Sequence, residues 1–283
     1  MFRTQAVESR SVVAQHRPWR ELRLGIVCAI AAGFAIGAAM LPPLAQSPAY
    51  HEFADDRSIF GIANVMDVAS NLPFLLIGVA GLLALRSEAA VAFRNSGERW
   101  IYALFFLGVA FTSVGSAYYH MAPDNARLVW DRLPMTIAFM SLVAATWAER
   151  IDTRAGVRLL VPLLALGIAS VVYWRLSAVH GVENLRPYLA VQYGSIAVVL
   201  AIAALLPSAY TGGNGIYAVA ALYGFAKVAE HFDAAIFEQT SLVSGHSVKH
   251  LLAACAIYRI LRMLEERAVV GRQQPKGEAR SSH

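Results

Sequence analysis

Long apolar stretches alternate with short polar links along most of this chain. Each stretch holds about 20 residues, the length that a helix needs to cross the hydrocarbon core of a bilayer. The pattern predicts eight membrane-spanning helices, at residues 22–41, 62–85, 100–120, 129–147, 156–177, 188–206, 214–237 and 244–264. We therefore expect an all-α, polytopic membrane helix bundle.

Composition and charge agree with this class. Hydrophobic residues make up 57% of the chain and charged residues only 15%, which fits a soluble domain poorly. The formal net charge is +5, but most arginines and lysines fall on one side of the predicted bundle. This bias follows the positive-inside rule for a protein with both termini in the cytoplasm. No basic patch is left to bind nucleic acid, and nothing in the sequence predicts an oligomeric state.

The predicted helices divide the chain into five regions. They are a basic cytoplasmic tail (1–21), an extra N-terminal transmembrane helix (22–41), an outer loop (42–61), a seven-helix core (62–264) and a second cytoplasmic tail (265–283). The Arg-rich first tail is typical of a disordered segment near an anionic membrane surface. The first helix also resembles a signal peptide, but its length favours a retained anchor. Short loops suit a bacterial inner membrane.

Three histidines stand where apolar residues are expected, near the outer ends of the predicted helices. His246 and His250 are four residues apart, so both side chains lie on one helix face and can reach one metal ion. His120 has the right depth to be a third ligand, which gives the pattern of a catalytic zinc site with an open position. A purely structural pair and a haem site are the alternatives. The inner halves of the helices look apolar.

Ser116 and Asp131 lie near His120 along the sequence. Ser116 is one helical turn before it, and the link to the next helix is short enough to bring Asp131 to a similar depth. Asp131 could be a metal ligand, a partner that orients a histidine, or the base for a metal-bound water. Ser116 could donate a hydrogen bond to an oxyanion, or simply to its own helix backbone.

Further polar residues lie at the same depth. The outer loop carries Asp55 and Asp56, which are either solvated or part of a calcium site, because calcium prefers oxygen ligands. We expect His231 to join a buried hydrogen-bond network that supports the histidine site, and His180 to lie on the surface. The other candidates for a calcium site or a supporting polar network are Asn64, Asp67, Asn71, Glu230 and Asp233.

Four short motifs carry a resemblance to a known family: NVMDVASN, GSAYYH, DRLPM and GHSVKH. Together they resemble the alkaline ceramidases, within a superfamily of seven-helix membrane hydrolases that includes the progestin and adiponectin receptors. The resemblance covers about residues 60–265. It implies zinc held by His120, His246 and His250, with Ser116 and Asp131 contacting the zinc-bound water.

The implied activity is hydrolysis of a lipid amide, such as ceramide, to a fatty acid and an amine or sphingoid base, with the substrate entering from the outer leaflet. The sequence departs from the family at Arg132, where the eukaryotic enzymes carry an acidic residue. Their calcium-binding segment is matched only loosely, by Asp55, Asp56 and Asn64. The main alternative is a receptor or sensor of the same superfamily, with the metal site but little or no hydrolase activity.

Overall fold

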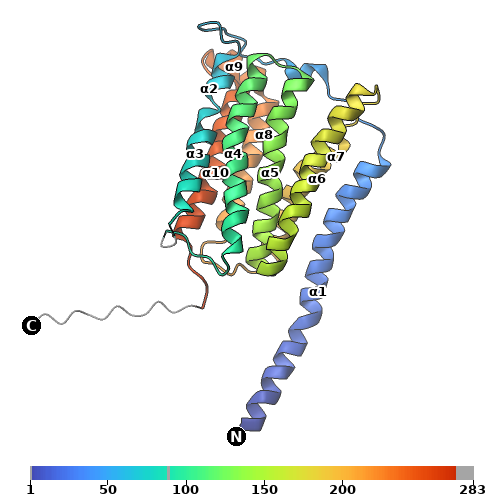
Figure 1. Cartoon of the computed structure of the whole chain (residues 1–283), viewed down its shortest axis with the longest axis vertical. Coiled ribbons are helices and arrows are strands. Elements are labelled where there is room, and N and C mark those ends of the chain that lie inside the picture. The colour runs from blue at the N-terminus through green and yellow to red at the C-terminus, as the bar shows by residue number, and fades with distance from the viewer. Residues whose placement is uncertain (1, 88–89, 272–283) are drawn as a thin grey trace, which may run out of the picture.

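The computed structural model describes residues 2–87 and 90–271, with side chains described from residue 18 onward. Its helices run roughly parallel in one bundle, with the long first helix along one side (Figure 1). The elements are α1 (Phe2–Met40), the 3₁₀ helix η1 (Pro48–His51), α2 (Val65–Ala69), α3 (Leu72–Ala84), α4 (Gly97–Met121), α5 (Asn125–Arg150), α6 (Thr153–Val179), α7 (Arg186–Leu205), α8 (Gly215–His231), α9 (Asp233–Thr240) and α10 (Gly245–Glu266).

The all-α polytopic bundle expected from hydropathy is confirmed. Within the described residues, six helices are long and apolar enough to cross a membrane. They are Pro18–Met40, Val65–Ala84, Gly97–Met121, Asn125–Arg150, Thr153–Val179 and Arg186–Leu205. The remaining two expected crossings stay predictions, because α8 has only 17 residues and α10 carries Lys249, Arg259 and Arg262 along its length. Both still pack side by side within the bundle, with α10 also against α3.

Two predicted helices are broken near the end that carries the histidines. The segment expected at 62–85 divides into α2 and α3, and Pro73 in the first turn of α3 has no N–H to continue the ladder of α2. The segment expected at 214–237 ends at His231, and after Phe232 the short helix α9 begins. Both breaks place polar side chains at the end of the bundle that carries the histidines.

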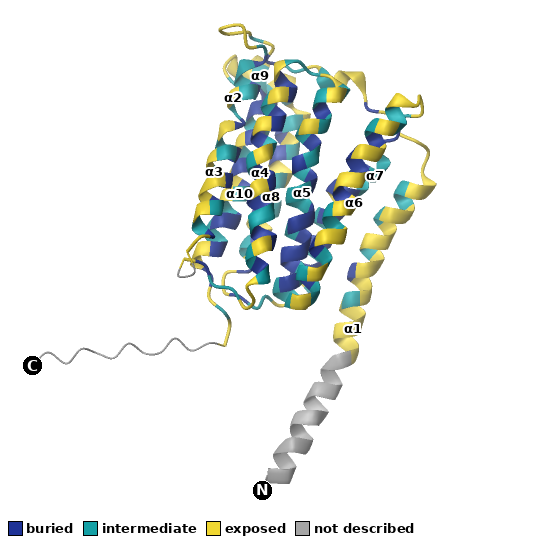
Figure 2. Cartoon of the chain, in the orientation of Figure 1, coloured by how far each residue is buried: buried dark blue, intermediate teal, exposed yellow. Residues whose placement is uncertain are grey.

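The basic tail expected at 1–21 falls largely within the first part of α1, which begins at Phe2, and its disorder stays a prediction. The apolar part of α1 packs mainly against α7. Only 6% of that span is buried, compared with 28–56% for the other five candidates. Figure 2 shows this contrast between the exposed α1 and the buried faces of α4 and α5.

The end of the bundle away from the histidines is not the plain apolar anchor that the sequence suggested. Glu98 is 1% exposed and accepts a hydrogen bond from the Tyr210 hydroxyl at 2.7 Å. The guanidinium of Arg267 lies 3.9 Å from the Tyr210 ring centroid and within 3.9 Å of the Glu149 carboxylate. These partners come from separate helix ends, so the network joins the ends together.

Helices α4 and α5 make their closest approach at Gly115. A Cβ atom at this position would lie 1.9 Å from the backbone oxygen of Trp130. We expect Gly115→Ala to force the helices apart and to lower the free energy of unfolding by about 1–3 kcal/mol. Gly224→Ala is the matched control, because a Cβ there meets nothing within 4 Å. Thermal unfolding of both variants in detergent checks this, and equal stability would refute the tight contact.

Candidate metal centre

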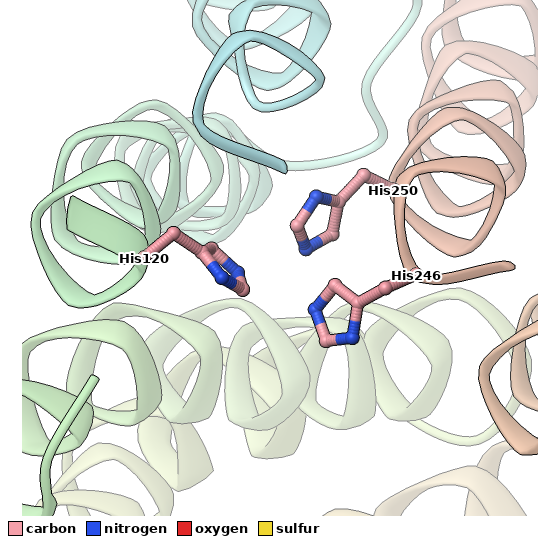
Figure 3. A group of neighbouring side chains, drawn as sticks. All are labelled: His120, His246 and His250. Carbon is pink, nitrogen blue, oxygen red and sulfur yellow. The ribbon is translucent and has the colours of Figure 1, made fainter. Parts of the chain in front are cut away.

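The three histidines meet in one buried cluster near the outer-loop end of the bundle. His120 comes from the last turn of α4, and His246 and His250 come from the first two turns of α10. Their ring centroids are 4.8–5.1 Å apart, and one nitrogen from each ring lies within 4.8 Å of the others. Figure 3 shows the rings directed toward a shared space.

This donor set suits a metal ion. All three residues are at most 5% exposed, and Nδ1 of His120 has no hydrogen-bond partner among the described residues. A buried polar nitrogen without a partner is costly unless something else binds it. Three imidazoles with room for a fourth ligand are the pattern of catalytic zinc sites. The cluster could therefore hold a metal ion, and its chemistry is compatible with zinc.

Ser70 fixes the orientation of His250. Its hydroxyl donates a hydrogen bond to the backbone oxygen of Asp67 at 2.9 Å and lies 2.7 Å from Nδ1 of His250. A hydroxyl has one proton, and here a carbonyl takes it, so Nδ1 of His250 must donate to Ser70. Nε2 of His250 then keeps its lone pair for a metal ion. Partners of this kind commonly set the tautomer of a histidine ligand.

Asp67 extends this support to the start of α10. Its Oδ1 accepts hydrogen bonds from the hydroxyls of Ser244 at 3.1 Å and Ser247 at 2.6 Å, and its backbone oxygen also accepts one from Asn71 at 2.8 Å. Ser244 is the N-cap of α10 and accepts a hydrogen bond from the backbone N–H of Ser247. The short helix α2 thereby fixes the turn of α10 that carries the two histidines.

Replacing Ser70 with alanine should weaken binding of a metal ion at the cluster by about 10- to 100-fold, because His250 loses the partner that sets its tautomer and ring orientation. Ser70→Thr keeps the hydroxyl and should restore most of the affinity. Titration against a zinc chelator measures the effect. Ser113→Ala is the matched control, since this buried hydroxyl bonds the backbone oxygen of Asn71 and contacts no histidine. An equal loss in both alanine variants would contradict the positioning role.

Ser116 and Asp131 lie beside each other across the α4–α5 contact. Ser116 is 2% exposed, and its hydroxyl is within hydrogen-bonding reach of the Asp131 carboxylate. The charge of Lys249 acts on Asp131 and also on all three histidines. Ser116 is one helical turn before His120 on α4, so Ser116 and Asp131 adjoin the histidine cluster.

Lys249 was not predicted as a site residue. Its ammonium group lies 2.7 Å from Nε2 of His246 and 3.0 Å from the carboxylate of Glu230, which also pairs with Lys227. Lysine can only donate, so Nε2 of His246 accepts and offers the lone pair that a metal ion would use. A metal ion at this nitrogen would shift Lys249 toward Glu230.

The outer loop covers the histidine cluster. The Phe53 ring centroid lies 4.6 Å from that of His120 and 4.7 Å from that of His246. His51 is hydrogen-bonded through Nδ1 to the Tyr119 hydroxyl at 2.9 Å and through Nε2 to Asn125 at 3.0 Å. These contacts hold the loop against α4 and α5, directly over the rings.

Asp233 fastens the same loop from the other side. One carboxylate oxygen accepts from the backbone N–H of His246 at 2.7 Å, and the other accepts from the backbone N–H of Ala54 at 3.0 Å. The carboxylate therefore joins the loop, the start of α9 and the first turn of α10. We call this pair of contacts the Asp233 clasp.

The residues considered for calcium are not grouped as a cation site in the described part of the chain. Asp55 is paired with Arg57, whose guanidinium donates to Oδ1 at 2.6 Å and holds the pKa of Asp55 below its usual value. Asp56 is exposed. Asn64 donates to the backbone oxygen of His120 at 2.8 Å. Asp67, Asn71, Glu230 and Asp233 are bonded as described above. A calcium site among these residues stays a prediction.

Two other histidines were assigned roles from sequence. His180 is exposed, as expected. His231 was expected in a buried hydrogen-bond network, and this is wrong, because His231 is exposed and its ring packs beside Phe232. Since α8 ends at His231 and the chain turns at Phe232, the imidazole faces away from the cluster that Glu230 and Lys249 join.

Arg132, the departure from the family motif, lies in an aromatic box. Its side chain is 3% exposed, and the guanidinium carbon lies 4.3 Å from the Trp174 ring centroid and 4.6 Å from that of Tyr188. It also donates to the Gln46 side chain in the outer loop. Aromatic faces attract a cation, which explains how a buried arginine is accommodated without a carboxylate partner.

An apolar cavity of about 150 Å³ lies inside the bundle next to the site. Its lining includes Thr112 and Met135, each one turn further into the bundle than Ser116 and Asp131, and Phe74, whose ring contacts His250. On α4 the lining extends from Thr112 back to Phe105, a length of about 10 Å at the helical rise. The cavity could accept a hydrocarbon chain.

The fold and the cluster define an integral membrane protein of the all-α bundle type, with three histidines that could hold a metal ion. A family model described as Ceramidase matches residues 58–280, and the chain belongs to this family. The resemblance to alkaline ceramidases is therefore confirmed, and it supports lipid amide hydrolysis in general. No curated protein matches the chain. Helix α1 lies outside the matched residues.

Proposed function

We propose that this protein hydrolyses the amide bond of ceramide or a related N-acyl lipid, and that zinc is its metal. The products are a free fatty acid and an amine such as a sphingoid base. One observation carries the proposal: three buried imidazoles form a cluster near an apolar cavity, in a chain of the ceramidase family. The adjoining pair of Ser116 and Asp131 supports it.

His120, His246 and His250 would hold the ion. When bound, zinc supplies a Lewis acid for the carbonyl oxygen and a water whose pKa falls to about 7. Asp131 accepts the proton of the attacking water and delivers it to the leaving nitrogen. The Ser116 hydroxyl, beside Asp131, donates a hydrogen bond to the oxygen of the attacked carbonyl.

The apolar cavity supports a lipid substrate that enters from the bilayer. It begins one turn from Ser116 and Asp131, so a hydrocarbon chain placed in it would bring an amide group to the histidines. Phe53 covers the opposite side of the cluster, which favours entry sideways between helices. We further propose a bacterial inner-membrane location, with both termini in the cytoplasm and the site toward the outer leaflet, as the distribution of basic residues favours.

The direct test uses the purified, full-length protein with its metal content measured. It is incubated in mixed micelles with ceramide, other N-acyl lipids and an ester lipid of the same acyl chain. We expect fatty acid and amine to appear in equal amounts from at least one amide substrate. A receptor of the same superfamily would bind metal without turnover, so zinc-loaded protein that releases no fatty acid from any amide would refute the proposal.

A further inference from the structure

Helix α1 is an addition to the matched family region and contacts little of it. Its main packing partner is α7, where the Phe34 side chain meets the backbone at Gly194. In Figure 1, α1 lies on the α6–α7 side of the bundle. Only 6% of the apolar span of α1 is buried, so a further interaction is needed to hold this helix beside the bundle.

An apolar groove of about 620 Å³ separates α1 from the neighbouring helices. On the α1 side its lining includes the small residues Ala31, Ala35 and Ala38, which leave the space open. On the other side it is lined by side chains of α5, α6 and α7, including Trp147. Within a bilayer, such a space is filled by a hydrocarbon chain.

The groove leads to a polar opening at the end of the bundle away from the histidines. This opening has a volume of about 580 Å³, and its lining includes Arg23 and Arg150. The Arg150 guanidinium donates to the backbone oxygens of Leu206 and Gly213 and lies 3.7 Å from the Glu149 carboxylate, so Arg23 is the exposed basic group of this lining.

Val27 and Trp147 line the groove, whereas Arg23 and Arg150 line the opening. Arg23 is four residues from Val27, and Arg150 is three residues from Trp147. Residues at such spacings share a helix face. The groove and the opening therefore lie on adjoining turns of α1 and α5.

We propose that this combined site binds an anionic phospholipid of the leaflet opposite the histidine cluster. One acyl chain fills the groove, and the phosphate of the head group lies at the opening beside Arg23. Arginine is well suited to phosphate, and basic pockets between transmembrane helices are known sites for anionic lipid head groups. The lipid then joins α1 to the bundle, which accounts for the small area buried by the helix itself.

Native mass spectrometry of the full-length, delipidated protein tests the head-group part. Phosphatidylglycerol and phosphatidylcholine with identical acyl chains are added in turn. We expect phosphatidylglycerol to bind more tightly, and Arg23→Gln to weaken that binding about five-fold with little effect on phosphatidylcholine. Arg158→Gln is the matched control, because Arg158 is exposed at the same end and lines neither space. Equal binding of both lipids to the unaltered protein, or equal effects of the two variants, would overturn the proposal.

A second variant tests the groove. Ala35→Trp fills the apolar space and should reduce binding of both lipids, whereas Ala32→Trp, at a position on α1 that does not line the groove, should not. Helical content and thermal unfolding show whether each variant is folded. If Ala35→Trp does not fold, the result for Arg23→Gln alone decides whether the lipid site is correct. If a folded Ala35→Trp binds lipid normally, the tail site is refuted.

Discussion

Replacing His120 with alanine is expected to remove metal binding and, with it, lipid amide hydrolysis. Apparent binding free energies of zinc in protein sites are about 10–16 kcal/mol. If three histidines share such a value, losing one costs roughly 3–5 kcal/mol, or about two to four orders of magnitude in affinity. Metal analysis of the purified variant, alongside fatty-acid release from the best amide substrate, measures both effects.

The control for this change is His231→Ala. It removes an imidazole that is exposed and lies at the end of α8, outside the cluster. This variant should keep its metal and its activity. If His120→Ala retains one metal per chain at the affinity of the unaltered protein, the three-histidine centre is wrong, whatever happens to turnover.

The second large effect is expected from Asp131→Asn. The amide keeps the size of the side chain and can still bond to Ser116, but it cannot accept and return a proton. General acid–base groups contribute about 10²- to 10⁴-fold to rate, so kcat should fall by that factor while the zinc content stays unchanged. Steady-state kinetics together with metal analysis separate this from loss of the ion.

A matched variant on the same helix is Asp124→Asn. Asp124 is the N-cap of α5 and accepts a hydrogen bond from the backbone N–H of Arg127, which asparagine can also do. Its effect on kcat should be slight. Loss of zinc from Asp131→Asn would instead make Asp131 a ligand, and an unchanged kcat would remove it from the chemistry.

Much of the candidate site follows from spacing and depth along the sequence. His246 and His250 are one turn apart, so any helix places them on one face. His120 lies in the last turn of one helix, and Asp131 lies in the second turn of the next. Because the link between these helices is short, both residues lie near the same end of the bundle. A polar side chain buried in hydrocarbon needs a partner. The nearest partners for these residues are the other polar residues of the same site, so they are expected to face one another.

The helix breaks could not be predicted in the same way. Hydropathy averaged over 62–85 and over 214–237 stays high, because the long apolar stretches outweigh the few polar residues at each break. What ends the helices is backbone geometry: the missing N–H of Pro73 and the turn at Phe232. The second turn decides the position of His231, which is why a neighbour of Glu230 proved to be exposed.

The supporting residues were missed because periodicity says nothing about loops or distant partners. Ser70 and His250 are 180 residues apart in sequence. Phe53 lies in an irregular loop, where no repeat fixes the direction of a side chain. Lys249 stands between two histidines on α10, and only the position of Glu230 on α8 shows that its ammonium group points toward His246.

The loop that carries Phe53 lies across the approach to the histidines from its end of the bundle. The aromatic ring packs against His120 and His246, and the Asp233 carboxylate bonds the loop to the first turn of α10. Movement of this loop would therefore set how fast a metal ion enters or leaves the cluster. Slow exchange is the expected result, and a time course of metal uptake by the folded, metal-free protein measures it.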